Sequence, residues 1–516
     1  MTDTTLSWWE TAVVYQIYPR SYQDSNDDGI GDLPGITTRL EYIANLGVDA
    51  IWISPFFKSP QKDFGYDVSD YCDINPEYGT LDDFDQLLTK AHEHGLKVMV
   101  DIVPAHCSDQ HQWFVESRQS RDNDKADWFH WVEPQPDGNP PTNWLSFFGG
   151  PAWTWEPQRQ QYYLHNFLSS QPNLNHANPV VREALMDVAR FWFDRGVDGF
   201  RLDAVHTINA DSAPYKNNVA NPKFVPGDLP QQQQPFFRQL HDSAQLNQPS
   251  IQSFSESFRS VADNYTDRYL MGELHGDDPI KASQTFTAPG RLHATYNFNL
   301  LKWDGLDVDG IKSAITDAIE AFNGTGRLSF AFSNHDVPRS ATRQLAPLGL
   351  SADRQPALQL LLLKLETCLP GSTCIYQGEE LALQDVQDIP VEHMQDPWGI
   401  EFAPTFLGRD TCRTPMVWKS DAPNGGFSKA NSTWLPIAEQ HLSRAAFDEV
   451  AKTESVYNQF AEFLGWRKKQ PAFMQANNMT EITGGHKQII FDRISDQQSL
   501  RCSFDFESLT ATFEEI

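Results

Sequence analysis

The sequence has few cysteines and no paired cysteine motif. Its 516 residues include six cysteines, none of them in a Cys-x-x-Cys pair. In a chain of this length, that density indicates neither a disulfide framework nor a zinc site. The six are Cys72, Cys107, Cys368, Cys374, Cys412 and Cys502.

Basic residues are scarce relative to acidic ones. Lys and Arg number 40 against 69 Asp and Glu, which gives a formal net charge of −29 at pH 7. This balance argues against nucleic acids and anionic membrane surfaces as partners. Two interpretations of the acidic surface stay open. It is either adapted to high salt, where screening relieves self-repulsion, or it is that of an ordinary acidic enzyme.

The sequence also lacks a long apolar run. The richest one, residues 360–369, is interrupted by Lys364 and Glu366 and cannot span a bilayer. The first ten residues have neither the basic start nor the apolar core of a secretory signal. We therefore expect no membrane partner and a cytoplasmic location.

The chain does contain a repeating strand–helix pattern. Apolar strands are expected at residues 13–19, 49–55, 97–103 and 197–203, with helices at 38–46, 80–95 and 179–195 between them. Nearly continuous apolar strands alternating with helices are typical of a parallel sheet covered by helices. Four more strands are expected at 269–273, 294–299, 328–333 and 372–376, which makes eight.

Two stretches depart from this pattern. Residues 104–178 are rich in Trp, Pro, Gly, Asn and Gln with no clear helix, and predict an inserted domain. Residues 488–491 and 500–504 predict strands of a small antiparallel domain. The fold is thus expected to be an α/β (β/α)8 TIM barrel with an insertion after strand three and a C-terminal antiparallel β domain. The expected divisions are 1–103 with 179–440 for the barrel (an extra subdomain at about 377–430), 104–178 for the inserted domain and 441–516 for the C-terminal region.

An oxygen-rich loop follows the first strand. Asp24, Asn26, Asp28 and Asp32 stand at alternate positions around a turn glycine, and Ile30 offers a backbone carbonyl. Hard cations prefer such oxygen ligands. The twelfth position is glycine rather than glutamate, so an EF-hand is not expected. We favour a single structural Ca²⁺ (or Mg²⁺) loop over a bare Asn/Asp-rich turn.

Three carboxylates follow expected strands, where TIM barrels place their catalytic groups. They are Asp203, Glu273 and Asp336. Arg201 precedes the first of them, where it can hold Asp203 ionised, and His335 precedes the last. Singly, each acid is as often a helix cap or a turn residue. Together they indicate acetal cleavage, in which one carboxylate attacks or shields the anomeric carbon while another donates a proton to the leaving oxygen.

The sequence resembles the α-amylase family of glycoside hydrolases (family 13), and within it the α-glucosidase and oligo-1,6-glucosidase branch. The matching text includes Tyr-Gln-Ile-Tyr-Pro-Arg-Ser-Tyr, Gln-Pro-Asn-Leu-Asn, Gly-Phe-Arg-Leu-Asp, Ser-Asn-His-Asp and Arg-Thr-Pro-Met, in the family's order. The resemblance implies a retaining mechanism with Asp203 as nucleophile, Glu273 as acid/base and Asp336 as transition-state stabiliser. It also implies a metal loop and no organic cofactor. The implied glucose contacts are Asp63, Tyr66, His106, Arg201, His335 and Arg413, and the implied metal ligands are Asp24, Asn26, Asp28, Ile30 and Asp32.

The function that the resemblance implies is an exo-acting α-glucosidase. It would release terminal non-reducing glucose from short sugars such as maltose or sucrose, with some transglucosylation, as a monomer or homodimer. Ala204, where relatives that cut α-1,6 bonds tend to have valine, favours α-1,4 bonds. A sucrose or trehalose isomerase or glucosyltransferase is the alternative, with the loops at 207–268 and 377–430 deciding. A non-catalytic transporter accessory subunit is a third reading, and the presence of all three carboxylates counts against it.

Overall fold

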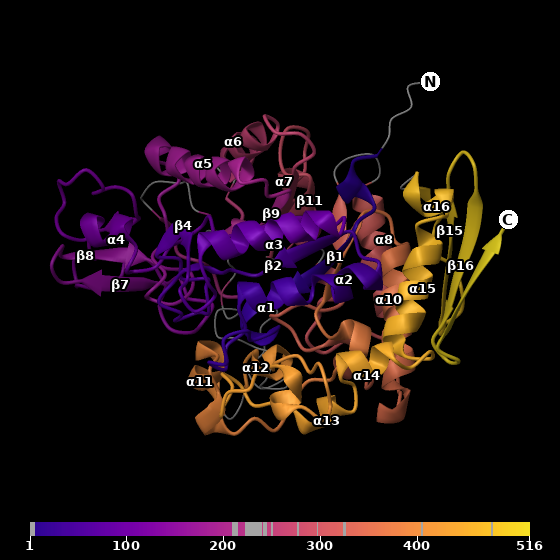
Figure 1. The fold of residues 1–516 in the computed structure, drawn as a ribbon. Coiled ribbons are helices and arrows are strands. Elements are labelled where there is room, and N and C mark those ends of the chain that lie inside the picture. The colour runs from indigo at the N-terminus through magenta and orange to yellow at the C-terminus, as the bar shows by residue number, and fades with distance from the viewer. Residues whose placement is uncertain are drawn as a thin grey trace.

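Eight parallel strands form a closed barrel at the centre of the molecule (Figure 1). The structure is a computed structural model and describes residues 6–208, 215–221, 240, 245–248, 251–275, 278–296, 298–322, 327–403, 406–475 and 478–516. The first and last strands of the barrel pair in register, with Val14 beside Cys374. This confirms the predicted (β/α)8 barrel. The strands are β1 (Val13–Ile17), β2 (Ala50–Ile53), β5 (Lys97–Ile102), β9 (Gly199–Leu202), β10 (Tyr269–Gly272), β11 (Ala294–Tyr296), β12 (Leu328–Phe330) and β13 (Ser372–Tyr376).

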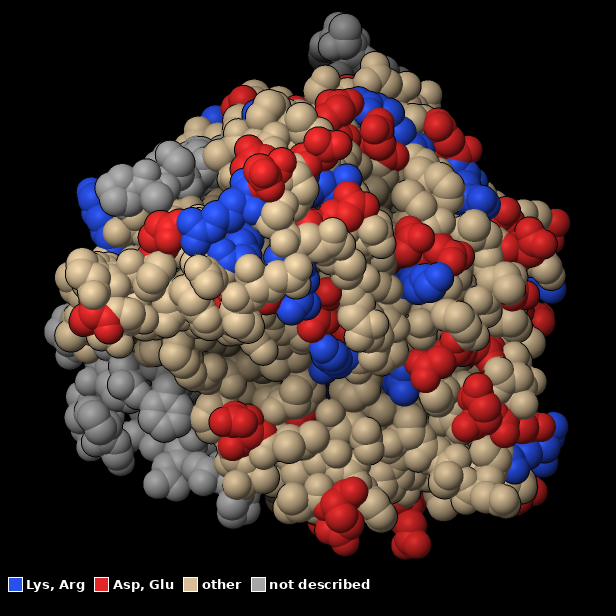
Figure 2. Space-filling view, turned by 90° about the vertical axis from the view of Figure 1, so that its left-hand side faces the viewer, with Lys and Arg blue, Asp and Glu red and all other residues tan. Residues whose placement is uncertain are grey.

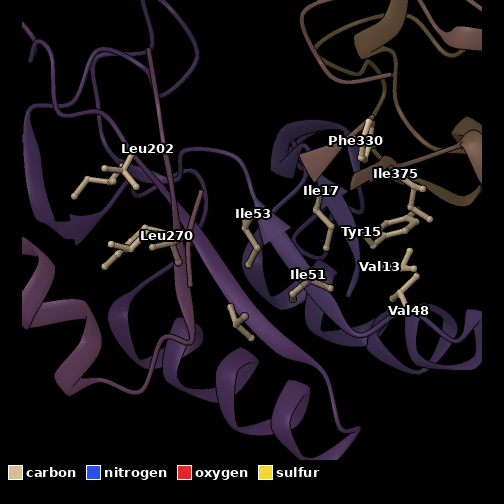
Figure 3. Close-up of a cluster of buried hydrophobic side chains, with 14 of the residues drawn as sticks. Val13, Tyr15, Ile17, Val48, Ile51, Ile53, Leu202, Leu270, Phe330 and Ile375 are labelled. Carbon is tan, nitrogen blue, oxygen red and sulfur yellow. The ribbon is translucent and has the colours of Figure 1, made fainter. Parts of the chain in front are cut away.

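The barrel strands are apolar because both of their faces are buried. All five residues of β1 are buried. Val13, Tyr15 and Ile17 belong to the large cluster between strands and helices (Figure 3), whereas Val14 belongs to a second cluster that also contains Trp52. Alternate side chains therefore pack on opposite sides of the sheet, as expected for a helix-covered parallel barrel.

Helices surround the barrel, and several of them begin at a side-chain cap. Thr80 caps the helix that follows it through a reciprocal pair of contacts with Asp83, and Asn178 accepts from the Val180 N–H. The helix expected at 38–46 is instead a pair of helices meeting at Arg39, because Asp32 caps an earlier start by accepting from the Gly35 N–H. The main helices are α1 (Leu33–Thr38), α2 (Leu40–Leu46), α3 (Leu81–Glu93), α5 (Pro179–Asp194), α6 (Ile251–Ala262), α7 (Pro279–Phe286), α8 (Val308–Ala321) and α10 (Gln355–Cys368).

The segment between β5 and β9 projects to the left in Figure 1. It contains a three-stranded sheet in the order β6 (Trp131–Val132), β8 (Gln161–Leu164), β7 (Trp153–Glu156). It also contains the helix α4 (Gln112–Ser117), although no clear helix was expected here. His111 caps α4 by accepting from the Trp113 N–H, a role that its sequence position did not reveal.

The C-terminal region forms an antiparallel sheet, as predicted, at the right of Figure 1. Buried arginines join this region to the barrel. Arg467 donates to the carbonyl oxygens of Thr367 (2.6 Å) and Thr11 (3.0 Å), and Arg493 donates to that of Cys368 (2.6 Å). These bonds satisfy carbonyls at the end of α10 and just before β1. The elements are α15 (Val456–Arg467), β14 (Asn478–Met479), β15 (Gln488–Ile494), β16 (Ser499–Asp505) and β17 (Thr510–Glu515).

Acidic side chains are spread over the face shown in Figure 2, with fewer basic ones between them. Each of the six cysteines is a free thiol. Within the described ranges, no helix combines the length and apolarity needed to cross a membrane.

Candidate active site

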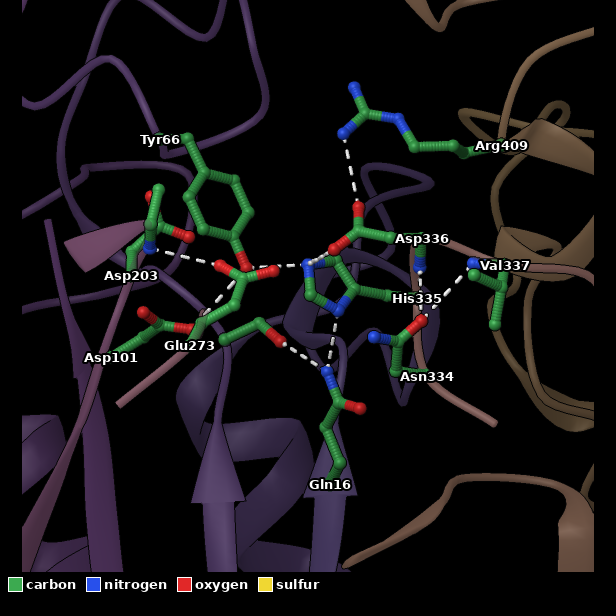
Figure 4. A network of polar contacts seen from close by, with 12 residues as sticks. Gln16, Tyr66, Asp101, Asp203, Glu273, Asn334, His335, Asp336, Val337 and Arg409 are labelled. Carbon is green, nitrogen blue, oxygen red and sulfur yellow. Dashed lines mark hydrogen bonds and ion pairs between the residues drawn. The ribbon is translucent and has the colours of Figure 1, made fainter. Parts of the chain in front are cut away.

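Two carboxylates from neighbouring strands contact one guanidinium, that of Arg201, at the C-terminal end of the barrel. Figure 4 shows these acids, Asp203 and Glu273, close to Tyr66 and His335. Asp203 directly follows β9 and Glu273 directly follows β10, and these strands pair in parallel. Arg201 Nη1 lies 2.5 Å from Asp203 Oδ1, and its Nη2 lies 2.7 Å from Glu273 Oε2. The parallel register therefore places the two acids side by side.

A third carboxylate shares the same cation. Arg201 Nη1 lies 3.0 Å from Oδ1 of Asp101, which is fully buried in β5 and also accepts from the Trp52 indole N–H. Burial raises the pKa of Asp101 to about 7. Burial, and after it the charges of Glu273 and Asp101, raises the pKa of Asp203 well above its ordinary value, although Arg201 opposes this. Burial therefore opposes the ionised form of Asp203, while Arg201, as expected from the sequence, favours it.

A left-handed turn at Ala204 orients the acids. Its φ of 42° lies in the region that non-glycine residues rarely adopt. In this conformation the Ala204 N–H donates to Glu273 Oε2 at 2.9 Å, and the Asp203 N–H donates to the Ile102 carbonyl. The turn therefore fixes the second acid relative to the first.

Asp336 lies among cationic and polar groups after β12. Its Oδ1 lies 3.1 Å from Arg409 Nη1 and 2.9 Å from Arg413 Nη2, and its Oδ2 lies 3.2 Å from His335 Nε2. Burial opposes ionisation of Asp336, but His335, Arg409 and Arg413 together hold its pKa well below the ordinary value. Asp336 is therefore a carboxylate at any working pH.

The contacts of His335 fix its tautomer. The Gln16 amide nitrogen lies 2.7 Å from His335 Nδ1 and donates to it, so the neutral ring carries its proton on Nε2. Burial lowers the pKa of His335 well below its ordinary value, which keeps the ring neutral. His335 Nε2 lies within contact distance of the Asp336 carboxylate and the Tyr66 hydroxyl. The rings of His335 and Tyr66 stack with their centroids 5.5 Å apart.

A second ion-pair group lies beside Asp336. Arg409 Nη2 lies 3.0 Å from Asp63 Oδ1 and 2.8 Å from Asp396 Oδ1, and Asp396 is fully buried. Gln171 donates to the other oxygen of Asp63 (2.9 Å) and lies 3.3 Å from His106 Nε2. The contacts thus extend from Asp336 through Arg409, Asp63 and Gln171 to His106.

The structure brings all the predicted catalytic and glucose-contacting residues into one connected group. Three charged members of the group had no role assigned from sequence: Asp101, Arg409 and Asp396. Asp101 carried a signal, since a carboxylate inside an apolar strand needs a partner. Neither Arg409 nor Asp396 had a sequence feature that indicated a place in the site.

Aromatic side chains of the inserted segment adjoin this group. The Arg409 guanidinium lies 5.2 Å from the Phe148 ring centroid, and the rings of Phe167 and His106 are 5.1 Å apart. Phe147 stacks on Phe167 at 5.1 Å. The insertion therefore supplies apolar faces next to the acids, of the kind that pack against sugar rings.

The loop at residues 24–32 carries oxygen donors of the kind that a metal ion needs. Asp24 and Asp32 are buried, and burial raises the pKa of Asp32, with the Asp24 charge adding to the effect. An all-oxygen donor set with two neighbouring buried acids suits a hard cation. Over the described ranges, however, no three acidic, histidine or cysteine side chains converge as a metal-binding group. The donor chemistry fits, and the ion itself stays a proposal.

Comparison with known proteins identifies the family. The family model for the α-amylase catalytic domain matches residues 16–476. The chain belongs to the α-amylase family. It is 46% identical to a probable alpha-glucosidase of Rhizobium meliloti, over all of this chain and 93% of that protein. Among solved structures of the family, the alpha-glucosyl transfer enzyme XgtA is 45% identical with a TM-score of 0.92, covering 97% of this chain and 92% of its own. The trehalulose synthase MutB of Pseudomonas mesoacidophila is 30% identical with a TM-score of 0.85, covering 97% and 91%.

Proposed function

We propose that the protein is a retaining, exo-acting α-glucosidase that removes terminal non-reducing glucose from short α-linked sugars, with transglucosylation as a second outcome. The observation that carries the proposal is the contact of Asp203 and Glu273 with the same guanidinium, with Asp336 joined to them through His335 and Tyr66. Retaining glycosidases need two carboxyl groups close enough to act on opposite sides of one glycosidic bond. The α-glucosidase of 46% identity supports the same reading.

The reaction proceeds in two steps. The Asp203 carboxylate attacks the anomeric carbon while the protonated Glu273 donates its proton to the departing glycosidic oxygen, leaving a glucosyl ester. The Glu273 carboxylate then takes a proton from water, whose oxygen displaces Asp203 from the anomeric carbon. Asp336 stabilises positive charge on the ring, and neutral His335 can donate to a sugar hydroxyl.

Transfer competes with hydrolysis when a sugar hydroxyl replaces water in the second step. The similarity to a glucosyl transfer enzyme and to a trehalulose synthase favours this second outcome as a real alternative. Two loops, 207–268 and 377–430, are expected to decide between them. The second is described except for residues 404–405, whereas 209–214 and most of 222–250 in the first fall outside the described residues. Product analysis from sucrose separates the outcomes: free glucose indicates hydrolysis, and isomerised disaccharide indicates internal transfer.

We also propose one structural Ca²⁺ (or Mg²⁺) in the loop at 24–32, held by Asp24, Asn26, Asp28, Asp32 and the Ile30 carbonyl. Bound there, the ion would neutralise the buried acids of the loop. The location in the cytoplasm, the preference for α-1,4 bonds and the choice between monomer and homodimer stay predictions, as do the domain divisions.

The test compares two Asp→Asn variants on one strand. Asp203→Asn should lower the rate of 4-nitrophenyl α-glucoside hydrolysis by roughly 10⁴-fold or more, because the attacking group is lost. Asp198 precedes the same strand at the opposite end of the barrel, where it binds Lys97 and His92. Asp198→Asn should lower stability while the folded enzyme keeps its rate. Equal rates for the two variants would contradict Asp203 as nucleophile, and β-glucose as the first anomer released would contradict retention.

A further inference from the structure

A cavity of about 460 Å³ opens at the end of the barrel opposite the catalytic acids. Its lining includes residues that come just before four barrel strands: Trp9 before β1, Arg268 before β10, His293 before β11 and Arg327 before β12. The catalytic acids follow strand ends, so the barrel separates the two places. The volume lies within the range of small-ligand sites, about 300–1,000 Å³.

The lining is charged but balanced. Three arginines face three acids, and two of the pairs are closed: Arg327 with Glu10 at 2.8 Å and Arg259 with Asp263 at 2.6 Å. The formal charge of the lining is therefore near zero, which selects neither an anion nor a cation. The charged lining residues are Glu10, Arg259, Asp263, Asp267, Arg268 and Arg327.

Hydrogen-bonding groups remain beside the closed pairs. His293 Nδ1 accepts from the Leu270 N–H at 3.0 Å, so the neutral ring carries its proton on Nε2. Burial lowers the pKa of His293 to about 3, which keeps it neutral. Within the described part of the chain, the Asp267 carboxylate has no hydrogen-bond or ion-pair partner. Arg268 donates to the Thr266 carbonyl at 3.2 Å and lies 3.7 Å from Asp198, which already accepts from His92, Lys97 and Val98.

A hydroxyl group both donates and accepts, and so matches a lining of donors beside acceptors with no net charge. Trp9, which stacks on Tyr269 at 5.1 Å, adds an aromatic ring to the same cavity. Neutrality, mixed polar groups and an aromatic wall together suit a sugar better than an ion or an apolar ligand. We propose that this cavity is a second carbohydrate-binding site that holds a neutral mono- or disaccharide. It is independent of the catalytic proposal, because it requires binding only.

The experiment counts bound glucose. Glucose is neutral and has no glycosidic bond, so the wild-type protein can be used without turnover. Equilibrium dialysis against labelled D-glucose would compare wild type with Ala288→Trp, which fills the cavity from a half-buried lining position without removing a polar contact. Ala451→Trp, on an exposed position after the helix α14 (Ala446–Val450), is the matched control.

Ala288→Trp should bind one glucose fewer per chain than wild type and Ala451→Trp. The difference is expected whether or not glucose also occupies the catalytic site. Equal numbers in all three proteins would overturn the proposal.

Asp267→Asn provides a second measurement should the larger residue disturb folding. Asn tolerates the positive φ of this position (53°) and removes only the carboxylate. It should weaken one class of glucose sites several-fold and leave any other class unchanged. An unchanged binding curve, or a glucose-soaked crystal with sugar only beside Asp203, would also overturn the proposal.

Discussion

Arg201 faces three carboxylates with a single positive charge, and this imbalance governs how the site responds to pH. The folded-state pKa of Asp101, about 7, lies above the value of about 3.9 for an unfolded aspartate. Between these values the folded protein holds the proton more tightly than the unfolded chain does. The contribution of Asp101 to stability is therefore fully present below about pH 4 and declines as the pH rises to about 7.

Asp101→Asn removes this decline. The difference in melting temperature, variant minus wild type, should become more positive from pH 5 to pH 8. The kcat/KM of the variant should fall, because Arg201 and Tyr66 lose a shared partner. Thermal unfolding across this pH range, with Asp137→Asn on the exposed surface as control, measures the effect. A difference in melting temperature that does not change with pH would contradict the assignment.

Arg409 holds three acids through its two-armed guanidinium, with Asp396 anchoring it and Asp63 and Asp336 facing the site. A lysine keeps the charge but cannot make these contacts together. Arg409→Lys should lower kcat/KM on an aryl α-glucoside by about 10–100-fold, since small displacements of positioning groups cost that much. Arg190→Lys, at an exposed pair with Glu183, should behave as wild type. A loss of melting temperature without a loss of kcat/KM would indicate a purely structural role.

The acids that the structure brings together were predictable from sequence where a local rule applied. Asp203, Glu273 and Asp336 each end an apolar run, and parallel strands bring such ends together. Arg409 and Asp396 obey no such rule, because their positions depend on how residues 377–430 fold over the barrel. The raised pKa values of Asp101 and Asp203 also needed coordinates, since they arise from burial and from charges on separate strands.

At the scale of elements, the loop at 24–32 contacts a distant part of the chain. The Trp434 N–H donates to the Gly29 carbonyl, and the Asp24 N–H donates to that of Phe427. A residue with a Cβ at Gly29 would lie 2.3 Å from the Ser432 carbonyl oxygen, and its φ of 91° also favours glycine. Order in the loop is therefore coupled to order in residues 427–434.

Removal of the proposed ion should weaken both segments. EDTA should lower the stability of the wild-type protein by about 2–3 kcal/mol, and CaCl₂ should restore it, as expected for a ligand bound only by the folded state. Asp28→Ala should start at a lower melting temperature and respond to neither reagent, whereas Asp122→Ala on the surface should respond as wild type. Equal responses of wild type and Asp28→Ala would argue against the loop as the metal site.

The helices followed the sequence where caps and apolar spacing agreed. α3 and α5 begin within one residue of the predicted starts, 80 and 179, and the structure shows Thr80 and Asn178 as their caps. α4 was missed because it is a single short helix in a segment rich in turn residues, and short helices depend on tertiary packing. The additional helix α1, which precedes the expected helix at 38–46, likewise depends on Asp32 as its cap. The sequence had assigned Asp32 to the metal loop alone.

On the scale of the whole molecule, the net charge of −29 opposes the compact state. Adding NaCl should therefore raise the melting temperature at pH 7, because screening weakens repulsion among the acids. The same addition at pH 4.8, close to the isoelectric point, should have little effect and serves as the control. Equal effects at the two pH values would attribute the response to general salt effects on folding.

The contact of Arg467 with the start of the chain can form only late in protein synthesis. The bond of Arg467 to the Thr11 carbonyl joins residues 456 positions apart, and β1 also waits for β13 before its second edge is paired. At about 5–20 residues per second, a ribosome needs roughly half a minute or more to synthesise that interval. The first strand has one unpaired edge until β13 is synthesised, and the Thr11 carbonyl lacks its partner until residue 467. Nascent chains halted before residue 372 should therefore be protease-sensitive near their beginning and should depend on chaperones until release.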